Sequence, residues 1–195
     1  MQRRDAITKW FATLAFLLAF AGHATAQTAA FSAEDVERID TLLRLIQERL
    51  DVAPEVARTK WNTKAPIEDL PREQQIIDRV RGKAKELDLD ARMVGEFFQA
   101  QIEASKIIQT TRHTMWAAEK RAPFEKVADL GKDIRPVLDR LEPALLAALR
   151  DAKPVLERPG AKPLLDARAT DLIKVSGVDL QAGTVALAPL YAIAK

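Results

Sequence analysis

Apolar residues recur every three or four positions between residues 32 and 62, and this spacing predicts one long amphipathic α-helix. Its buried stripe would comprise Ile39, Leu43, Ile46, Leu50, Ala53 and Ala57. At about 100° per residue, Arg49 and Lys60 lie about 20° apart around the helix axis, and both fall inside this stripe. A buried cation without a partner costs several kcal/mol, so we expect both residues to face acidic side chains or an anionic ligand. The alternative is that their apolar stems cover the edge of the core while the charged ends reach solvent.

The same spacing continues along the chain and predicts an all-α fold. Further helices are expected over residues 72–87, 91–120, 132–152 and 164–174, with a final helix from about residue 179. Ser32 and Asp35 resemble a capping box, and Asp69 and Asp90 are placed to cap the second and third helices. Apart from the apolar C-terminal stretch, no segment alternates polar and apolar residues as a strand does. We therefore expect a single-domain bundle of about six helices.

Residues 1–26 are typical of a secretory signal peptide. They comprise a basic start, MQRRDAITK, an apolar run, WFATLAFLLAF, and a small-x-small site that ends at Ala26. The apolar run is short for a bilayer span, so cleavage after Ala26 would leave a periplasmic or secreted mature protein. Cleavage removes three of the 30 basic and one of the 28 acidic residues, which leaves a net charge of zero with histidine neutral. A neutral mature chain gives no reason to expect nucleic acid or a membrane as partner.

The chain contains no cysteine, and His113 is the one histidine that would remain after cleavage. Thiol catalysis, zinc–thiolate sites and iron–sulfur clusters are therefore excluded. A single histidine is also a poor basis for a metal site or a catalytic triad. We expect no metal and no cofactor.

Four polar residues interrupt the apolar face of the helix expected over residues 91–120. Gln101, Ser105, Gln109 and Arg112 fall near the middle of that face, three or four residues apart. A buried donor without a partner costs about 1–3 kcal/mol. One such residue is usually a structural hydrogen bond, whereas four at this spacing favour the wall of a polar pocket inside the bundle.

These features, together with charged residues nearby in the chain, define a candidate site that is rich in cations. It comprises Arg49, Lys60, Asp69, Arg72, Glu73, Ser105, Gln109 and Arg135. The set lacks a nucleophile–base pair, and the chain has no glycine-rich loop to cradle phosphate. The site therefore fits a compact anion with more than one carboxylate and a reaction that needs no proton transfer.

Three motifs resemble the all-helical, type II chorismate mutases. They are Arg49-x10-Lys60, Pro-Ile-Glu-Asp-x2-Arg-Glu at residues 66–73, and Ser105-x3-Gln109 on a later helix. The signal peptide, the run PIEDLPREQQ and a second helical half are similar to the exported, gamma-type subclass, in which one chain supplies a whole active site. The match is good over residues 33–112 and loose over residues 129–150. It implies a catalytic half at about residues 33–120 and an accessory helical half at about residues 129–195.

The resemblance implies that chorismate is converted to prephenate by an internal Claisen rearrangement, in the shikimate route to aromatic amino acids. Arg49 and Arg135 would bind the two substrate carboxylates, with Arg72 and Ser105 assisting. Because the match needs a one-residue offset in the loop before Arg135, Lys132 is the alternative.

The resemblance also implies the remaining roles. Lys60 and Gln109 would donate hydrogen bonds to the ether oxygen as its bond breaks. Glu73 would accept from the ring hydroxyl, and Asp69 would position that end of the substrate. Relatives suggest a homodimer, and a stand-alone activity is expected because no dehydratase or dehydrogenase domain is fused.

The sequence leaves three alternatives open. Arg121, in the expected loop, is a further substitute for Arg135. An isochorismate–pyruvate lyase on the same scaffold would use similar donors. An exported helical binding protein could have kept the bundle without the chemistry.

Overall fold

The computed structural model describes residues 31–175 and 177–195, and within them six α-helices and no β-strand, which confirms the predicted all-α fold. The α-helices are α1 (Ala33–Thr63), α2 (Leu70–Ala84), α3 (Ala91–Ala118), α4 (Arg135–Leu156), α5 (Ala161–Leu172) and α6 (Leu180–Ile193). The shorter helical segments are η1 (Lys85–Leu87), η2 (Leu130–Ile134) and η3 (Gly177–Asp179). The predicted signal peptide, residues 1–26, lies outside the described residues. None of the helices in the described part of the chain combines the length and hydrophobicity that a membrane crossing needs.

Side-chain caps fix where the first three helices begin. The Ser32 Oγ atom accepts from the Asp35 N–H at 3.1 Å, and the Asp35 carboxylate accepts from the Ser32 N–H at 2.9 Å. This is the predicted capping box. Asp69 and Asp90 cap α2 and α3, also as predicted.

The predicted helix boundaries differ from the structure mainly in the second half of the chain. Residue 132, where the fourth helix was expected to begin, lies within the π-helical turn η2, and α4 follows from Arg135. This helix continues beyond residue 152 to Leu156, because Val155 and Leu156 are buried in the core. The fifth helix begins at Ala161 rather than residue 164, directly after Gly160, whose φ of 87° suits the turn between α4 and α5.

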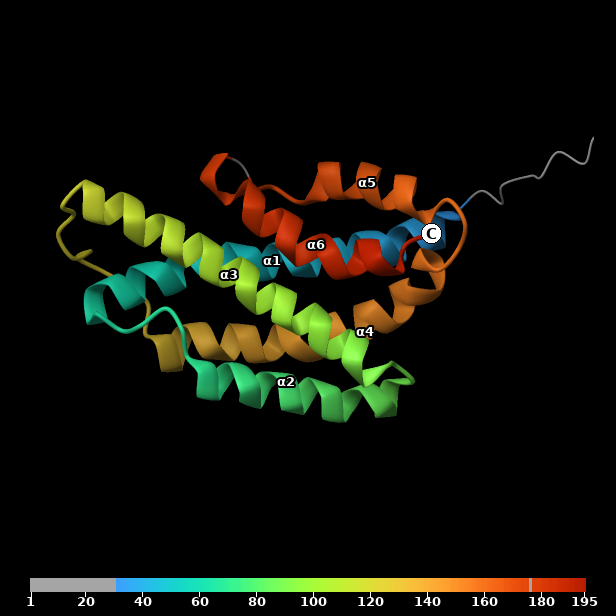
Figure 1. Ribbon diagram of the computed structural model, residues 1–195, viewed down its shortest axis with the longest axis horizontal. Helices are drawn as coiled ribbons and strands as arrows, with labels where there is room; N and C mark the ends of the chain where they lie inside the picture. The colour runs from blue at the N-terminus through green and yellow to red at the C-terminus, as the bar shows by residue number, and fades with distance from the viewer. Residues whose placement is uncertain (1–30, 176) are drawn as a thin grey trace, which may run out of the picture.

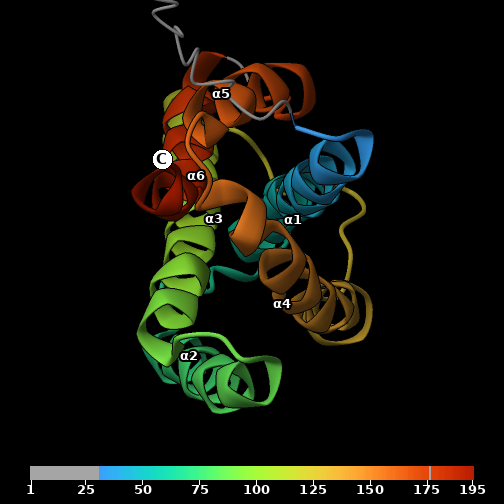
Figure 2. The same ribbon diagram turned by 90° about the vertical axis from the view of Figure 1, so that its right-hand side faces the viewer.

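Helix α1 lies at the centre of the bundle. Helices α3, α4 and α5 each pack against it, α2 packs on α3, and α6 runs along α3 (Figures 1 and 2). Helices α5 and α6 cover one side of the molecule, and α2 lies on the opposite side (Figure 2). The largest fully buried side chains come mainly from α1, α3 and α4 and include Leu42, Leu43, Ile46, Phe97, Phe98, Ile108, Leu145 and Leu149. This core fixes α1 relative to the helices on either side of the site.

Two of the four polar residues on α3 bind the C-terminal part of the chain. The Gln101 Nε2 atom donates to the Ala186 carbonyl at 2.8 Å, and the Arg112 guanidinium pairs with the Asp179 carboxylate at 2.6 Å. Neither Gln101 nor Arg112 lines the cavity described below. The prediction that all four residues wall one pocket is therefore wrong for these two, because η3 and α6 pack on this part of α3; of the other two, Ser105 lines the cavity whereas Gln109 lies behind its wall.

Candidate active site

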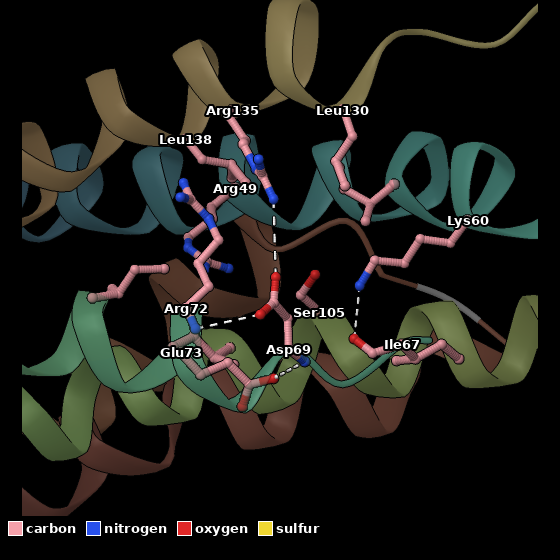
Figure 3. A pocket seen from close by; sticks show the side chains of 13 residues that line it. Arg49, Lys60, Ile67, Asp69, Arg72, Glu73, Ser105, Leu130, Arg135 and Leu138 are labelled. Carbon is pink, nitrogen blue, oxygen red and sulfur yellow. Dashed lines mark hydrogen bonds and ion pairs between the residues drawn. The ribbon is translucent and has the colours of Figure 1, made fainter. Parts of the chain in front are cut away.

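A cavity lies between α1, α2, α3 and the start of α4, and seven of the eight candidate residues line it (Figure 3). These seven are Arg49, Lys60, Asp69, Arg72, Glu73, Ser105 and Arg135. The apolar part of the wall comprises Val56, Ile67, Ile76, Ile102, Leu130 and Leu138. The cavity has a volume of about 110 Å³ and opens to solvent.

Arg49 reaches the cavity from the middle of α1. Its Nη1 atom donates to the Gln101 carbonyl at 2.8 Å, and it forms no ion pair within the described part of the chain. Burial lowers the pKa of Arg49 to about 10, against an opposing effect from the Glu142 carboxylate. The guanidinium is therefore still charged at neutral pH, but a neutral carbonyl only partly replaces its lost hydration. Such a cation favours an anion in the cavity.

Lys60 lies on the same face of α1, three turns further along. It is 8% exposed, and its ammonium donates to the Ile67 carbonyl at 2.7 Å (Figure 3). Burial lowers the pKa of Lys60, while the Asp69 and Glu73 carboxylates raise it. An ammonium group has three N–H donors, so the bond to Ile67 leaves others available to a ligand.

The start of α2 presents two carboxylates to the cavity. The Asp69 carboxylate accepts from the Arg72 N–H at 3.3 Å, and the Glu73 carboxylate accepts from the Asp69 N–H at 3.1 Å (Figure 3). These bonds at a helix N-terminus hold both acids in place. Arg135 approaches Asp69 at 3.9 Å, and the Arg72 guanidinium reaches Asp139 on α4 at 3.4 Å. Both arginines therefore retain N–H groups for a ligand.

Lys106, which holds Glu73 from α3, was not among the predicted site residues. Its ammonium lies 3.1 Å from the Glu73 carboxylate and 2.8 Å from the Glu103 carboxylate, with Glu68 at 3.9 Å. The Lys106 side chain is 15% exposed. The signal for it was available, because Lys106 follows the candidate Ser105 directly, but a single lysine on an apolar helix resembles a surface residue.

Gln109 stands behind the cavity wall. Its Nε2 atom donates to the Ser105 Oγ atom at 3.1 Å, and Ser105 itself lines the cavity. Gln109 is buried, and its Oε1 atom has no hydrogen-bond partner among the described residues. The amide thus has unused hydrogen-bonding capacity one helical turn from the cavity-lining serine.

Among the described residues of the second half, Arg135, at the start of α4, is the one whose charged side chain lines the cavity, beside the apolar Leu130 and Leu138. The two alternatives, Lys132 and Arg121, are not part of the cavity wall. Arg121 instead pairs with Glu119 and lies over the Phe124 ring.

Comparison with known proteins identifies the family. The family model for chorismate mutase type II matches residues 34–110. The secreted chorismate mutase of Mycolicibacterium smegmatis is 31% identical over 156 residues, which cover 80% of this chain and 85% of that protein. The chain belongs to the chorismate mutase family. A secreted chorismate mutase of Mycobacterium tuberculosis is 26% identical over 147 residues, 75% of this chain and 73% of that protein.

Solved chorismate mutase structures share the fold. The crystal structure of the Burkholderia phymatum chorismate mutase is similar with a TM-score of 0.74 at 26% identity, covering 80% of this chain and 97% of that one. The crystal structure of the Burkholderia thailandensis chorismate mutase is similar with a TM-score of 0.73 at 31% identity. The match covers 78% of this chain and 98% of that one. These matches extend well beyond residue 110, where the family model ends. The shared fold therefore includes at least part of the chain beyond residue 110.

Proposed function

We propose that this protein is an exported chorismate mutase that converts chorismate to prephenate by an intramolecular Claisen rearrangement. The single observation that carries this proposal is the composition of the cavity wall, with four cations against two carboxylates. An excess of two positive charges complements a substrate with two carboxylates. Family membership supports the same substrate.

In this mechanism Arg49 and Arg135 bind the two substrate carboxylates, assisted by Arg72 and Ser105. The Glu73 carboxylate accepts from the ring hydroxyl. These contacts hold the substrate folded, with the atoms that form the new bond close together. The reaction requires no acid or base, because every bond change occurs within the substrate.

The rate then depends on charge stabilisation at the ether oxygen. Lys60 would donate with an N–H that its bond to Ile67 leaves free. Gln109 would donate after its amide turns, so that Oε1 accepts from the Ser105 hydroxyl and Nε2 becomes free to donate; as the amide stands, the buried Oε1 atom has no partner among the described residues. A million-fold acceleration corresponds to about 8 kcal/mol. Two donors to the ether oxygen at about 3 kcal/mol each, together with the folded substrate, are sufficient.

The test is to incubate the purified protein separately with chorismate and with isochorismate. We expect chorismate to be consumed and prephenate to form, without release of pyruvate. Pyruvate release from isochorismate alone would identify the lyase instead. No reaction with either compound would favour a binding protein.

Export and assembly belong to the same proposal. The relatives named secreted chorismate mutases and the signal-like residues 1–26 support a periplasmic or secreted mature protein. Fractionation of a cell that produces the full chain tests this, with residue 27 expected at the mature N-terminus. We further propose a homodimer, which light scattering after size-exclusion chromatography tests. Seven of the eight residues assigned to the site line one cavity within a single chain.

A further inference from the structure

Residues 119–129, which we name the strap, connect α3 to η2 without helix or strand of their own. Figure 1 shows this segment passing the end of α1 on its way to α4. A segment of this kind satisfies few of its backbone groups internally. The strap nevertheless leads directly to Leu130 and Arg135, which line the cavity. What holds the strap therefore determines where Arg135 lies.

Side chains of α1 bind the backbone of the strap at three residues. Asn62 makes a reciprocal pair with Phe124, because its Nδ2 atom donates to the Phe124 carbonyl and its Oδ1 atom accepts from the Phe124 N–H, both at 2.8 Å. Ala128 is bound in the same way by two residues: Thr59 donates to its carbonyl at 2.8 Å, and Glu55 accepts from its N–H at 3.0 Å.

Arg58 makes the third attachment. Its Nη2 atom donates to the Lys126 carbonyl at 2.9 Å, and its guanidinium lies 4.6 Å from the centre of the Phe124 ring. Arg58 is itself held by the Glu55 carboxylate at 2.9 Å. Arg58 and Thr59 follow Glu55 by three and four residues, and Asn62 follows them by four and three, so the four side chains share one stripe of the helix.

Helix α1 thus has two stripes that contact different parts of the molecule, the cavity and the strap. Lys60 lies about 140° from Glu55 around the axis and lines the cavity, while the stripe from Glu55 to Asn62 holds the strap. Beyond Ala128, the Asp129 carboxylate accepts from the N–H groups of Gly131 and Lys132 at 2.8 and 2.7 Å and caps η2. Fixed backbone therefore runs from α1 to Arg135.

We propose that Asn62 is a positioning residue for substrate binding, which acts by fixing the strap and through it the place of Arg135. This inference rests on the proposed function, in which Arg135 binds a substrate carboxylate. The nearest acidic group to Arg135 within the described residues is Asp69 at 3.9 Å, and the Arg135 side chain is 39% exposed. Its own side-chain contacts are thus weak, and the backbone before it sets its position.

Releasing the strap should weaken substrate binding more than it slows the reaction. If Arg135 occupies its binding position for a smaller fraction of the time, the apparent dissociation constant rises by the inverse of that fraction. Lys60 and Gln109 lie on α1 and α3 rather than on the strap, so we expect their positions to be retained. Loss of the reciprocal amide pair should therefore raise KM for chorismate about ten-fold while kcat stays within about three-fold.

The experiment compares wild type, Asn62→Ala, Arg135→Ala and the double variant in chorismate kinetics and in limited trypsin digestion. Lys120, Arg121 and Lys126 place tryptic sites within the strap. Asn62→Ala should raise KM, speed cleavage at these sites and add nothing to the KM of Arg135→Ala. The matched control is Gln47→Ala, because Gln47 is also an α1 amide that accepts from a backbone N–H of another segment, that of Lys174, at 2.7 Å. It should leave KM and strap cleavage unchanged.

An unchanged KM and an unchanged rate of strap cleavage in Asn62→Ala would overturn the inference. Increases in KM that add in the double variant would overturn it as well. If Arg135→Ala itself leaves KM unchanged, the inference also fails, while turnover by wild type still supports a mutase. If wild type does not turn over chorismate, the proposed function fails, and trypsin still reports whether Asn62 holds the strap. Should Asn62→Ala not fold, Asn62→Asp, which loses the donor alone, and Thr59→Val provide the same comparison.

Discussion

Replacing Lys106 by methionine tests how the cavity carboxylates are held. The Lys106 ammonium lies 3.1 Å from the Glu73 carboxylate, and the two side chains are 15% and 13% exposed. In Lys106→Met, Glu73 keeps its hydrogen bond from the Asp69 N–H but loses its cation. A hydrogen bond to a charged group contributes about 1.5–3 kcal/mol. The remaining hydrogen bond and the partial exposure of Glu73 favour the lower end of this energy range. We therefore expect kcat/KM for chorismate to fall about ten-fold.

The assay measures initial rates of chorismate consumption in Lys106→Met, Lys106→Arg, Glu73→Gln and the double variant Lys106→Met/Glu73→Gln. Arginine should restore most of the activity, and the double variant should be no slower than Glu73→Gln, because Lys106 acts through Glu73. Arg92→Met is the matched control, since it removes an α3 cation whose partner is Glu96 rather than a cavity residue. Losses that add in the double variant, or no loss in Lys106→Met, would refute this reasoning.

Three further predictions concern pH and stability. An amide donates at any pH and a glutamate only when protonated, so Gln109→Glu should lose activity as pH rises while wild type stays flat across neutrality; a flat profile in the variant contradicts the role of Gln109. Because burial lowers the pKa of Lys60 and the ammonium form is required, wild-type activity should decline at a pH below the ordinary lysine range. A pH–rate profile without this alkaline decline would contradict the role of the Lys60 ammonium. Asp40 is 4% exposed and accepts two hydrogen bonds from Arg168, at 2.7 and 2.8 Å, so Asp40→Asn should lower the free energy of unfolding by about 3 kcal/mol. Urea denaturation measures this loss, with Asp171→Asn as the control, because Asp171 is the exposed partner of the same arginine. For the control we expect a loss of about 1 kcal/mol or less. Equal losses in the two variants would contradict the prediction.

The part of the site on α1 and the start of α2 could be predicted because local rules determine it. Helical geometry alone places Arg49 and Lys60 on one face, and the capping residue Asp69 marks where α2 begins. Arg135 needed the resemblance as well, because it follows an irregular segment that ends in a π-helical turn. No periodicity indicates where such a segment leads.

What could not be predicted depends on contacts between segments distant in the chain. Gln101 and Arg112 have the spacing of cavity residues, but Gln101 binds Ala186 on α6 and Arg112 binds Asp179 on η3, and the position of these elements on α3 follows from packing of the whole bundle. In the sequence, Asn62 resembles any polar residue near a helix end. Its pairing with the strap is visible only in the folded structure. Lys106 becomes significant once α2 places Glu73 against α3.

The central claim is that inward-facing donors, Lys60 foremost, stabilise charge on a bound dicarboxylate as it rearranges. The most direct measurement is the turnover of chorismate by the purified protein and by its Lys60→Ala variant at saturating substrate. We expect wild type to form prephenate and the variant to lose about 10²- to 10³-fold in kcat, as when a preorganised donor to a developing oxyanion is removed. Equal kcat values for the two proteins would contradict the account.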